Sequence, residues 1–106
     1  MKMKYLNFSE EFAEKILGGE KIATLRLGIK DYKAGESVIV KAGDKNLGIA
    51  RISAVRMIKF KDLSKKDAIM DGFGSVEELK KTLEKFYGKI DPEDIFTQII
   101  FELVRQ

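Results

Sequence analysis

Hydrophobic and polar positions at the start of the chain predict a short strand followed by a helix. Residues 3–8 have an extended pattern typical of a strand. Apolar residues then recur at helical spacing, which predicts a helix over residues 9–18. Ser9 is suited to the N-cap of that helix. The paired Gly18 and Gly19 are suited to its end, because glycine adopts the left-handed cap conformation at little cost.

The next segment, residues 21–27, alternates between apolar and other side chains and predicts a strand with two distinct faces. Its apolar residues fall on the face expected to reach the core. Thr24 and Arg26 fall on the opposite face, and Lys21 lies at the entrance to the strand. An amine, a hydroxyl and a guanidinium are therefore expected to lie near one another.

The remaining pattern alternates strands and helices and predicts an α+β fold. Further strands are expected over residues 36–41, 47–60 and 95–104, and helices over 65–70 and 76–87. Ser64 is suited to an N-cap, and Ser75 with Glu78 has the spacing of a capping box. A break in the alternation predicts a bulge near residues 53–55, as a curled sheet requires. We expect a curled mixed sheet or partly closed β-barrel with helices packed outside.

Composition agrees with a globular chain that folds as one domain over residues 1–106. Hydrophobic residues make up 44% and charged residues 35% of the sequence, which is typical of a folded protein. No apolar run approaches the ~20 residues that a membrane helix needs, and the N-terminus lacks the apolar region of a secretory signal. We therefore expect a cytoplasmic protein without a membrane partner. The lysine- and glutamate-rich composition without cysteine would suit a heat-adapted organism.

The chain contains no cysteine and no histidine, which limits its possible chemistry. Disulfides, thiol nucleophiles, histidine-dependent triads and Cys/His metal sites are excluded. Any catalysis must use lysine, hydroxyl, carboxylate or arginine side chains, and we expect neither a cofactor nor a metal. The net charge of +3 permits nucleic-acid binding without requiring it.

The stretch Gly18-Gly19-Glu20-Lys21-Ile22-Ala23-Thr24-Leu25-Arg26 carries the main candidate site. A lysine with a lowered pKa can activate a threonine hydroxyl, and an arginine can bind a phosphate or a carbonyl. The simpler alternatives are a solvated lysine, a threonine that only fills a strand face, and an arginine in a surface ion pair. A phosphate-binding loop is set aside, because the spacing of that motif is absent.

Residues 19–26 resemble the G-x-K-x-x-T-x-R signature of the ASCH domain family, small relatives of the PUA RNA-binding barrel. Four later segments resemble other blocks of the family in the same order, namely 33–38, 48–52, 71–79 and 99–101. The resemblance implies a PUA-like β-barrel with a cleft lined by the signature residues. It also implies RNA or nucleotides as ligands.

Some bacterial ASCH proteins of similar size hydrolyse the amide of acetylated cytidine, and this activity is the alternative that the resemblance implies. Their signature lysine and threonine, which correspond to Lys21 and Thr24, act with a glutamate just before the long helix. The nearest acidic residue here is Asp71, which is one methylene shorter. Other family members are linked to RNA cleavage, which we expect less, or to transcription coactivators.

The primary hypothesis is therefore an RNA- or modified-nucleotide-binding domain, and the alternative is a metal-independent amidohydrolase with Lys21, Thr24 and Asp71 as catalytic residues. Four further residues are candidate ligand contacts: Arg26, Gly19, Tyr32 and Arg51. Tyr32 would stack on a base or pack as a lid, and Arg51 would bind a backbone phosphate or serve as an ordinary strand charge. A protein-interaction module ranks last.

Overall fold

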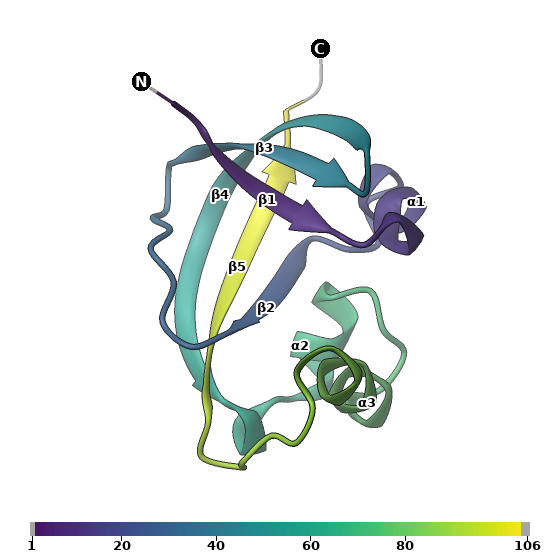
Figure 1. Ribbon diagram of the computed structural model, residues 1–106, viewed down its shortest axis with the longest axis vertical. Coiled ribbons are helices and arrows are strands. Elements are labelled where there is room, and N and C mark those ends of the chain that lie inside the picture. The colour runs from purple at the N-terminus through teal and green to yellow at the C-terminus, as the bar shows by residue number, and fades with distance from the viewer. Residues whose placement is uncertain (1, 105–106) are drawn as a thin grey trace.

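Residues 2–104, which the computed structural model describes, contain one five-stranded mixed sheet. The strands are β1 (Lys4–Phe8), β2 (Ala23–Leu27), β3 (Ser37–Ala42), β4 (Lys45–Lys59) and β5 (Ile95–Leu103). They are arranged in the order β1-β3-β4-β5-β2 (Figure 1). β1 runs parallel to β3, and the other neighbouring pairs are antiparallel.

The sheet curls into a half-barrel around the long strand β4. The first part of β4 pairs with β3, and its later part pairs with β5. The register between β4 and β5 shifts between Ile52 and Ala54, so Ser53 is the extra residue of a bulge. A bulge bends a strand and increases its twist. The bulge and the curled α+β fold predicted from the sequence are both confirmed.

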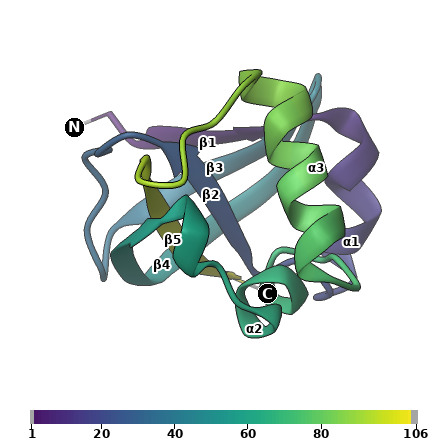
Figure 2. The same ribbon diagram turned by 90° about the horizontal axis from the view of Figure 1, so that it is seen from below.

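The helices lie on one side of this half-barrel (Figure 2). Two short 3₁₀ segments are η1 (Glu10–Phe12) and η2 (Phe60–Asp62), and the α-helices are α1 (Ala13–Leu17), α2 (Lys65–Met70) and α3 (Val76–Tyr87). Helix α1 follows β1 after the η1 turn. Helices α2 and α3 lie between β4 and β5 in the chain and pack against each other. The helices on this side create the space in which the candidate site lies.

Two local predictions need correction. The single helix predicted over residues 9–18 is a 3₁₀ turn followed by a short α-helix, and the Ser9 side chain makes no capping hydrogen bond. A tight 3₁₀ turn is common at a helix N-terminus. The capping box predicted at Ser75 is only half formed, because Ser75 Oγ accepts from the Glu78 N–H while the Glu78 carboxylate accepts from the Gly74 N–H. The full capping box is found instead at Ser64 and Asp67.

The buried apolar residues form two clusters. The first lies inside the curled sheet and under α1, with Leu6, Ile16, Val38, Val40, Ala50, Ile52, Ile99 and Phe101. The second lies between the sheet and helices α2 and α3, with Leu25, Phe60, Leu63, Ala68, Leu79, Leu83, Ile90 and Phe96. Phe12 packs against the first cluster and Phe73 against the second. These two rings meet edge to face, with centroids 6.3 Å apart, and so join the clusters.

Candidate functional site

A pocket of about 430 Å³ opens beside the Phe12–Phe73 contact. Its walls come from the end of β1, from η1, from β2, from the end of α2 and from α3. Small-molecule sites typically have volumes of ~300–1,000 Å³. Four polar residues predicted from the sequence line this main pocket: Lys21, Thr24, Arg26 and Asp71. The structure therefore brings together residues that are distant in the chain.

Lys21 and Asp71 form a buried ion pair in the main pocket. Their exposed fractions are 3% and 5%. The Lys21 ammonium donates hydrogen bonds to the Asp71 carboxylate and, at 3.1 Å, to the Asp71 backbone carbonyl. Removing either partner would leave a buried charge without its counterion, which is strongly unfavourable. The pair is thus a fixed feature of the fold rather than a chance surface contact.

The turn that carries Lys21 is anchored on both sides. The backbone N–H groups of Glu20 and Lys21 donate to the Lys15 carbonyl of α1, at 2.9 and 3.0 Å. The Ile22 N–H donates to the Met70 carbonyl at the end of α2, at 2.8 Å. These bonds tie the turn to both helices. They fix where the lysine side chain begins.

Asp71 is brought to Lys21 by the end of α2. It occupies the C-cap of that helix, and its N–H donates to carbonyls of the preceding turn. Gly72 follows with a φ of 89°, a conformation that glycine adopts easily. A Cβ on Gly72 would lie 3.2 Å from the Lys21 Cβ. A glycine at this position therefore permits the close approach of the two segments.

Thr24 and Arg26 reach the main pocket from β2, which is an edge strand of the sheet. Arg26 Nε donates to Thr24 Oγ1 at 3.2 Å, and Arg26 Nη2 donates to the Asn7 carbonyl at 2.7 Å. The guanidinium also lies 5.0 Å from the centre of the Phe8 ring. A guanidinium has five N–H donors, so these contacts orient it and leave donors for a ligand.

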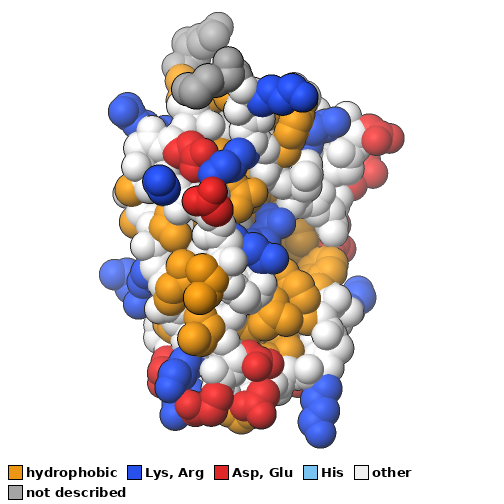
Figure 3. Space-filling model, turned by 60° about the vertical axis from the view of Figure 1, so that its left-hand side comes forward, with side chains coloured by type: hydrophobic (Ala, Val, Ile, Leu, Met, Phe, Trp, Pro, Cys, Tyr) orange, Lys and Arg blue, Asp and Glu red, His pale blue; other side chains and the backbone are white. Residues whose placement is uncertain are grey.

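Aromatic residues form much of the remaining pocket wall, namely Phe8, Phe12, Phe73, Phe86 and Tyr87. The Lys21 ammonium lies 4.9 Å from the Phe12 ring centre and 5.5 Å from that of Phe8, within range of a cation–π interaction. Basic and hydrophobic side chains lie side by side near the middle of the face shown in Figure 3. The pocket thus combines flat apolar surfaces with fixed positive charge.

Burial changes the proton affinities of the ion pair. It raises the pKa of Asp71 to about 6, although the nearby Lys21 and Arg26 favour the charged carboxylate. Burial lowers the pKa of Lys21, and the attraction of Asp71 opposes this effect. Both groups can therefore exchange protons closer to neutral pH than they would in water. That property suits acid–base chemistry.

The other three candidate ligand contacts lie outside the main pocket. Gly19 has a φ of 82° and completes the turn before Lys21. Tyr32 packs against the first apolar cluster, and its hydroxyl donates to the Tyr5 carbonyl at 2.9 Å. Arg51 is exposed on β4, opposite Ser37 and Glu102 on the neighbouring strands. The structure does not bring Tyr32 and Arg51 to Lys21.

The sequence did not identify the aromatic side of the pocket. Phe12 and Phe86 each belong to a run of apolar residues at helical spacing, a pattern typical of a core-facing stripe. In the structure Phe86 is 51% exposed and lines the pocket with Phe12. Helical periodicity could not reveal this, because a core stripe and a pocket wall have the same spacing.

A second group that the sequence did not reveal anchors α2. The buried Asp67 carboxylate accepts hydrogen bonds from Arg56 Nη2 at 2.5 Å and from Gln98 Nε2 at 2.9 Å. It also accepts from the backbone N–H and the hydroxyl of Ser64. These contacts connect the first turn of α2 to β4 and β5. They hold the helix that carries Asp71 at its end.

Residues 2–104 contain no group of three or more acidic side chains arranged to bind a metal ion. Within the same range, no helix is both long and apolar enough to cross a membrane.

Comparison with known proteins places the fold among solved structures. The ASCH domain from Lactobacillus crispatus JV V101 is 18% identical, with a TM-score of 0.80, and the match covers 93% of this chain and 79% of that one. Protein EF3133 from Enterococcus faecalis V583 is 17% identical, with a TM-score of 0.84 and coverage of 98% and 77%. The ASCH protein from Zymomonas mobilis is 19% identical, with a TM-score of 0.66 and coverage of 92% and 65%.

At these identities the structural likeness shows the fold alone. No curated protein matches the chain significantly in sequence. The family model of the ASCH domain matches residues 2–105, which is nearly the whole sequence. The half-barrel with outer helices is also the PUA-like architecture of that family. The chain therefore belongs to the ASCH domain family.

Proposed function

We propose that the main pocket binds a single nucleotide unit, either a modified nucleoside or one residue of an RNA. The observation that carries this proposal is the combination, in one pocket of about 430 Å³, of aromatic walls with Lys21, Thr24, Arg26 and Asp71. Membership of a PUA-like family supports RNA or its components as the ligand class.

The two sides of the pocket match the two chemical parts of such a ligand. Aromatic rings stack on any of the nucleobases, and each stacked base contributes about 1–3 kcal/mol to the binding free energy. The oriented Arg26 guanidinium has N–H groups that can donate to a base carbonyl or to a phosphate. The pocket contains two cations and one carboxylate, so its net charge favours an anionic ligand.

Binding can be tested by titrating the protein with cytidine, cytidine 5′-phosphate and a short RNA. We expect saturable binding, and the affinity for the phosphorylated ligands should fall with added salt because phosphate contacts release counterions. Arg26→Gln should weaken binding about tenfold or more, whereas Arg51→Gln, outside the pocket, serves as a matched control. If none of the ligands binds, or if both variants lose affinity equally, the proposal is wrong.

A second candidate function, hydrolysis of an acylated nucleoside, is favoured by the buried ion pair that lines the same pocket as Thr24. The Arg26 N–H donated to Thr24 Oγ1 would favour the deprotonated hydroxyl. Proton transfer within the pair would leave Lys21 as a neutral amine and Asp71 as a carboxylic acid. Lys21 would then take the Thr24 hydroxyl proton as the oxygen attacks the amide carbonyl, so that a C–O bond forms and the C–N bond breaks. Asp71 would supply a proton to the leaving amine. Water would cleave the resulting ester and restore the threonine.

The decisive assay for hydrolysis is release of cytidine from acetylcytidine. Wild type should be active, and Thr24→Ala and Lys21→Ala should each lose about 100-fold or more of kcat/KM. Thr24→Ser keeps the hydroxyl and should retain most of the activity. An inert wild type, or a fully active Thr24→Ala variant, would exclude this mechanism while leaving nucleotide binding open.

A further inference from the structure

A second pocket of about 240 Å³ adjoins the main pocket. The two pockets share Phe12, Phe73, Thr82 and Phe86, so these side chains form the boundary between them. The residues found only in this adjoining pocket are charged: Glu11, Lys15 and Lys85. A ligand that fills the main pocket can therefore extend across the aromatic boundary into a charged site.

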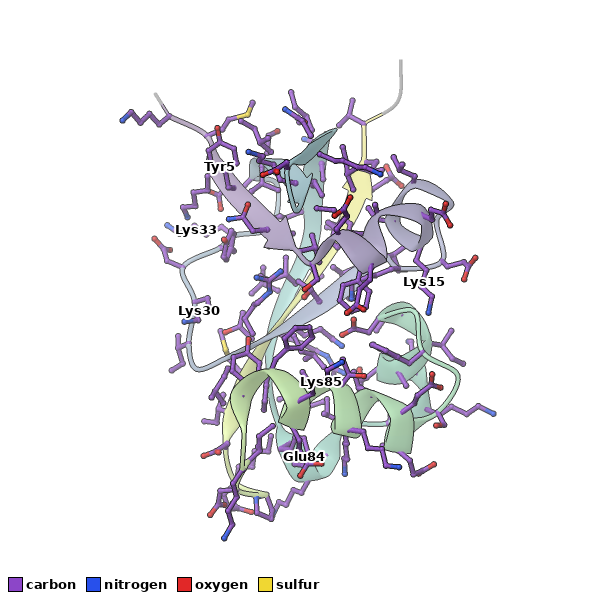
Figure 4. All side chains as sticks on the ribbon, turned by 45° about the vertical axis from the view of Figure 1, so that its right-hand side comes forward. Tyr5, Lys15, Lys30, Lys33, Glu84 and Lys85 are labelled. Atoms are coloured by element: carbon purple, nitrogen blue, oxygen red, sulfur yellow. The ribbon has the colours of Figure 1, made fainter. Side chains whose placement is uncertain are left out.

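The two lysines of the adjoining pocket come from different helices and border the same space. In Figure 4, Lys15 extends from α1 toward α3, and Lys85 lies on the side of α3 opposite Glu84. Lys15 Nζ donates to the Gly72 carbonyl at 2.8 Å and lies 5.5 Å from the Phe73 ring centre. These contacts fix its ammonium at the boundary between the pockets.

Lys85 differs from Lys15, because it is exposed and its ammonium is available for a ligand. Its position in the last turn of α3 also complements the helix dipole, which is the simpler structural role. That role does not explain why a second lysine from α1 borders the same pocket. With Glu11 as the one acidic side chain there, the adjoining pocket has an excess of positive charge.

The charge of Lys15 also acts electrostatically on Lys21 in the main pocket. Its charge is one of the factors that lower the pKa of Lys21, after burial, which is the largest. The charges of the two pockets are therefore close enough to interact. An anionic group beside Lys15 would be attracted by both sites.

We propose that the adjoining pocket binds a phosphate group attached to the nucleoside held in the main pocket. This inference rests on the proposed nucleotide-binding function and narrows its ligand class. The ligand would be a nucleoside phosphate or a nucleotide within an RNA rather than a free nucleoside. Two ammonium groups beside a stacking surface provide the charge that a phosphate needs next to its base.

The test compares the affinities of cytidine, cytidine 5′-phosphate, cytidine 3′-phosphate and a cytidine dinucleotide. Wild type should bind at least one phosphorylated ligand about tenfold more tightly than cytidine. Lys85→Gln should reduce this ratio toward one. It should also lower the number of counterions released on binding, read from the salt dependence of the affinity, by about one. Lys85→Arg should restore most of the ratio. Lys66→Gln removes an exposed lysine of α2 that borders neither pocket, and it should leave the ratio unchanged.

The outcomes separate this inference from the proposed function. A higher affinity for either monophosphate than for cytidine supports a phosphate site that accepts free nucleotides. A gain confined to the dinucleotide supports a phosphate site for RNA. If cytidine binds but no phosphate improves its affinity, or if Lys85→Gln and Lys66→Gln act alike, the phosphate site is excluded and nucleoside binding remains. If no ligand in the series binds to wild type, the proposed function itself fails.

Discussion

Single residues determine the chemistry of the pocket, and the Lys21–Asp71 pair is the central example. The sequence placed Lys21, Thr24 and Arg26 near one another, because strand alternation puts the last two on one face. It could not place Asp71, since the partner depends on how α2 packs against the turn at Lys21. The family resemblance indicated a carboxylate there, and the structure shows that the shorter aspartate reaches the lysine.

The pair predicts a pKa change that can be measured directly. The Lys21 ammonium stabilises the Asp71 carboxylate, so Lys21→Met should raise the pKa of Asp71 above its value of about 6. NMR titration of the aspartate carboxyl carbons measures this shift. Lys66→Met, at an exposed site on α2, should leave the pKa unchanged. A lower Asp71 pKa in Lys21→Met would contradict the proposed electrostatics.

The raised pKa of Asp71 also predicts how stability depends on pH. The folded protein keeps this proton up to about pH 6, whereas an unperturbed aspartate loses it near 3.8. The folded state therefore binds more protons between these values, and the contribution of Asp71 to stability falls as pH rises through this window. Urea denaturation at several pH values should show wild type losing roughly 1–3 kcal/mol relative to Asp71→Asn. Parallel pH curves for the two proteins would contradict this prediction.

At the scale of elements, hydrogen bonds at the ends of short segments fix the positions of the site residues. The turn before β2 is bonded to α1 and α2, and α2 is anchored to the sheet through Asp67. Strand and helix positions were predictable from periodicity and end signals, and the bulge in β4 from a break in alternation. The split into η1 and α1 and the Asp67 contacts were not predictable, because they depend on packing between distant segments.

The close approach at Gly72 predicts a difference between two glycines. Both Gly72 and Gly88 have positive φ angles, of 89° and 78°. Only at Gly72 would a Cβ crowd Lys21, at 3.2 Å, whereas none of the surrounding atoms lies within 4 Å at Gly88. Gly88→Ala should cost about 1–3 kcal/mol of unfolding free energy through backbone strain, and Gly72→Ala should cost more, because its Cβ also meets Lys21. Equal losses in chemical denaturation would show that the approach at Lys21 is not tight.

At the scale of the whole molecule, the pocket lies where the two apolar clusters meet. Phe12 belongs to one side and Phe73 to the other, and their edge-to-face contact borders both pockets. Hydrophobic patterning predicted that a core exists and which strands contribute to it. It could not show that the core divides into two clusters with a pocket at their junction, since that depends on the curvature of the sheet.

This arrangement predicts that an aromatic ring at the junction matters more for binding than for folding. Phe12→Leu keeps an apolar side chain in place and should cost about 1 kcal/mol of stability or less. It removes a stacking surface and should weaken nucleoside binding about tenfold. Tyr5→Leu removes an exposed ring outside both pockets and serves as the control. The role assigned to Phe12 would be wrong if its replacement left affinity unchanged.

The most direct test of nucleotide binding at the junction is an NMR titration of the labelled protein with cytidine 5′-phosphate. We expect saturable shift changes at the backbone amides of Thr24, Arg26 and Asp71, with smaller changes at Lys15 and Lys85. The amides of Tyr32 and Arg51 should change little. The absence of saturable changes, or changes confined to the surface around Arg51, would show that the nucleotide does not bind at the junction.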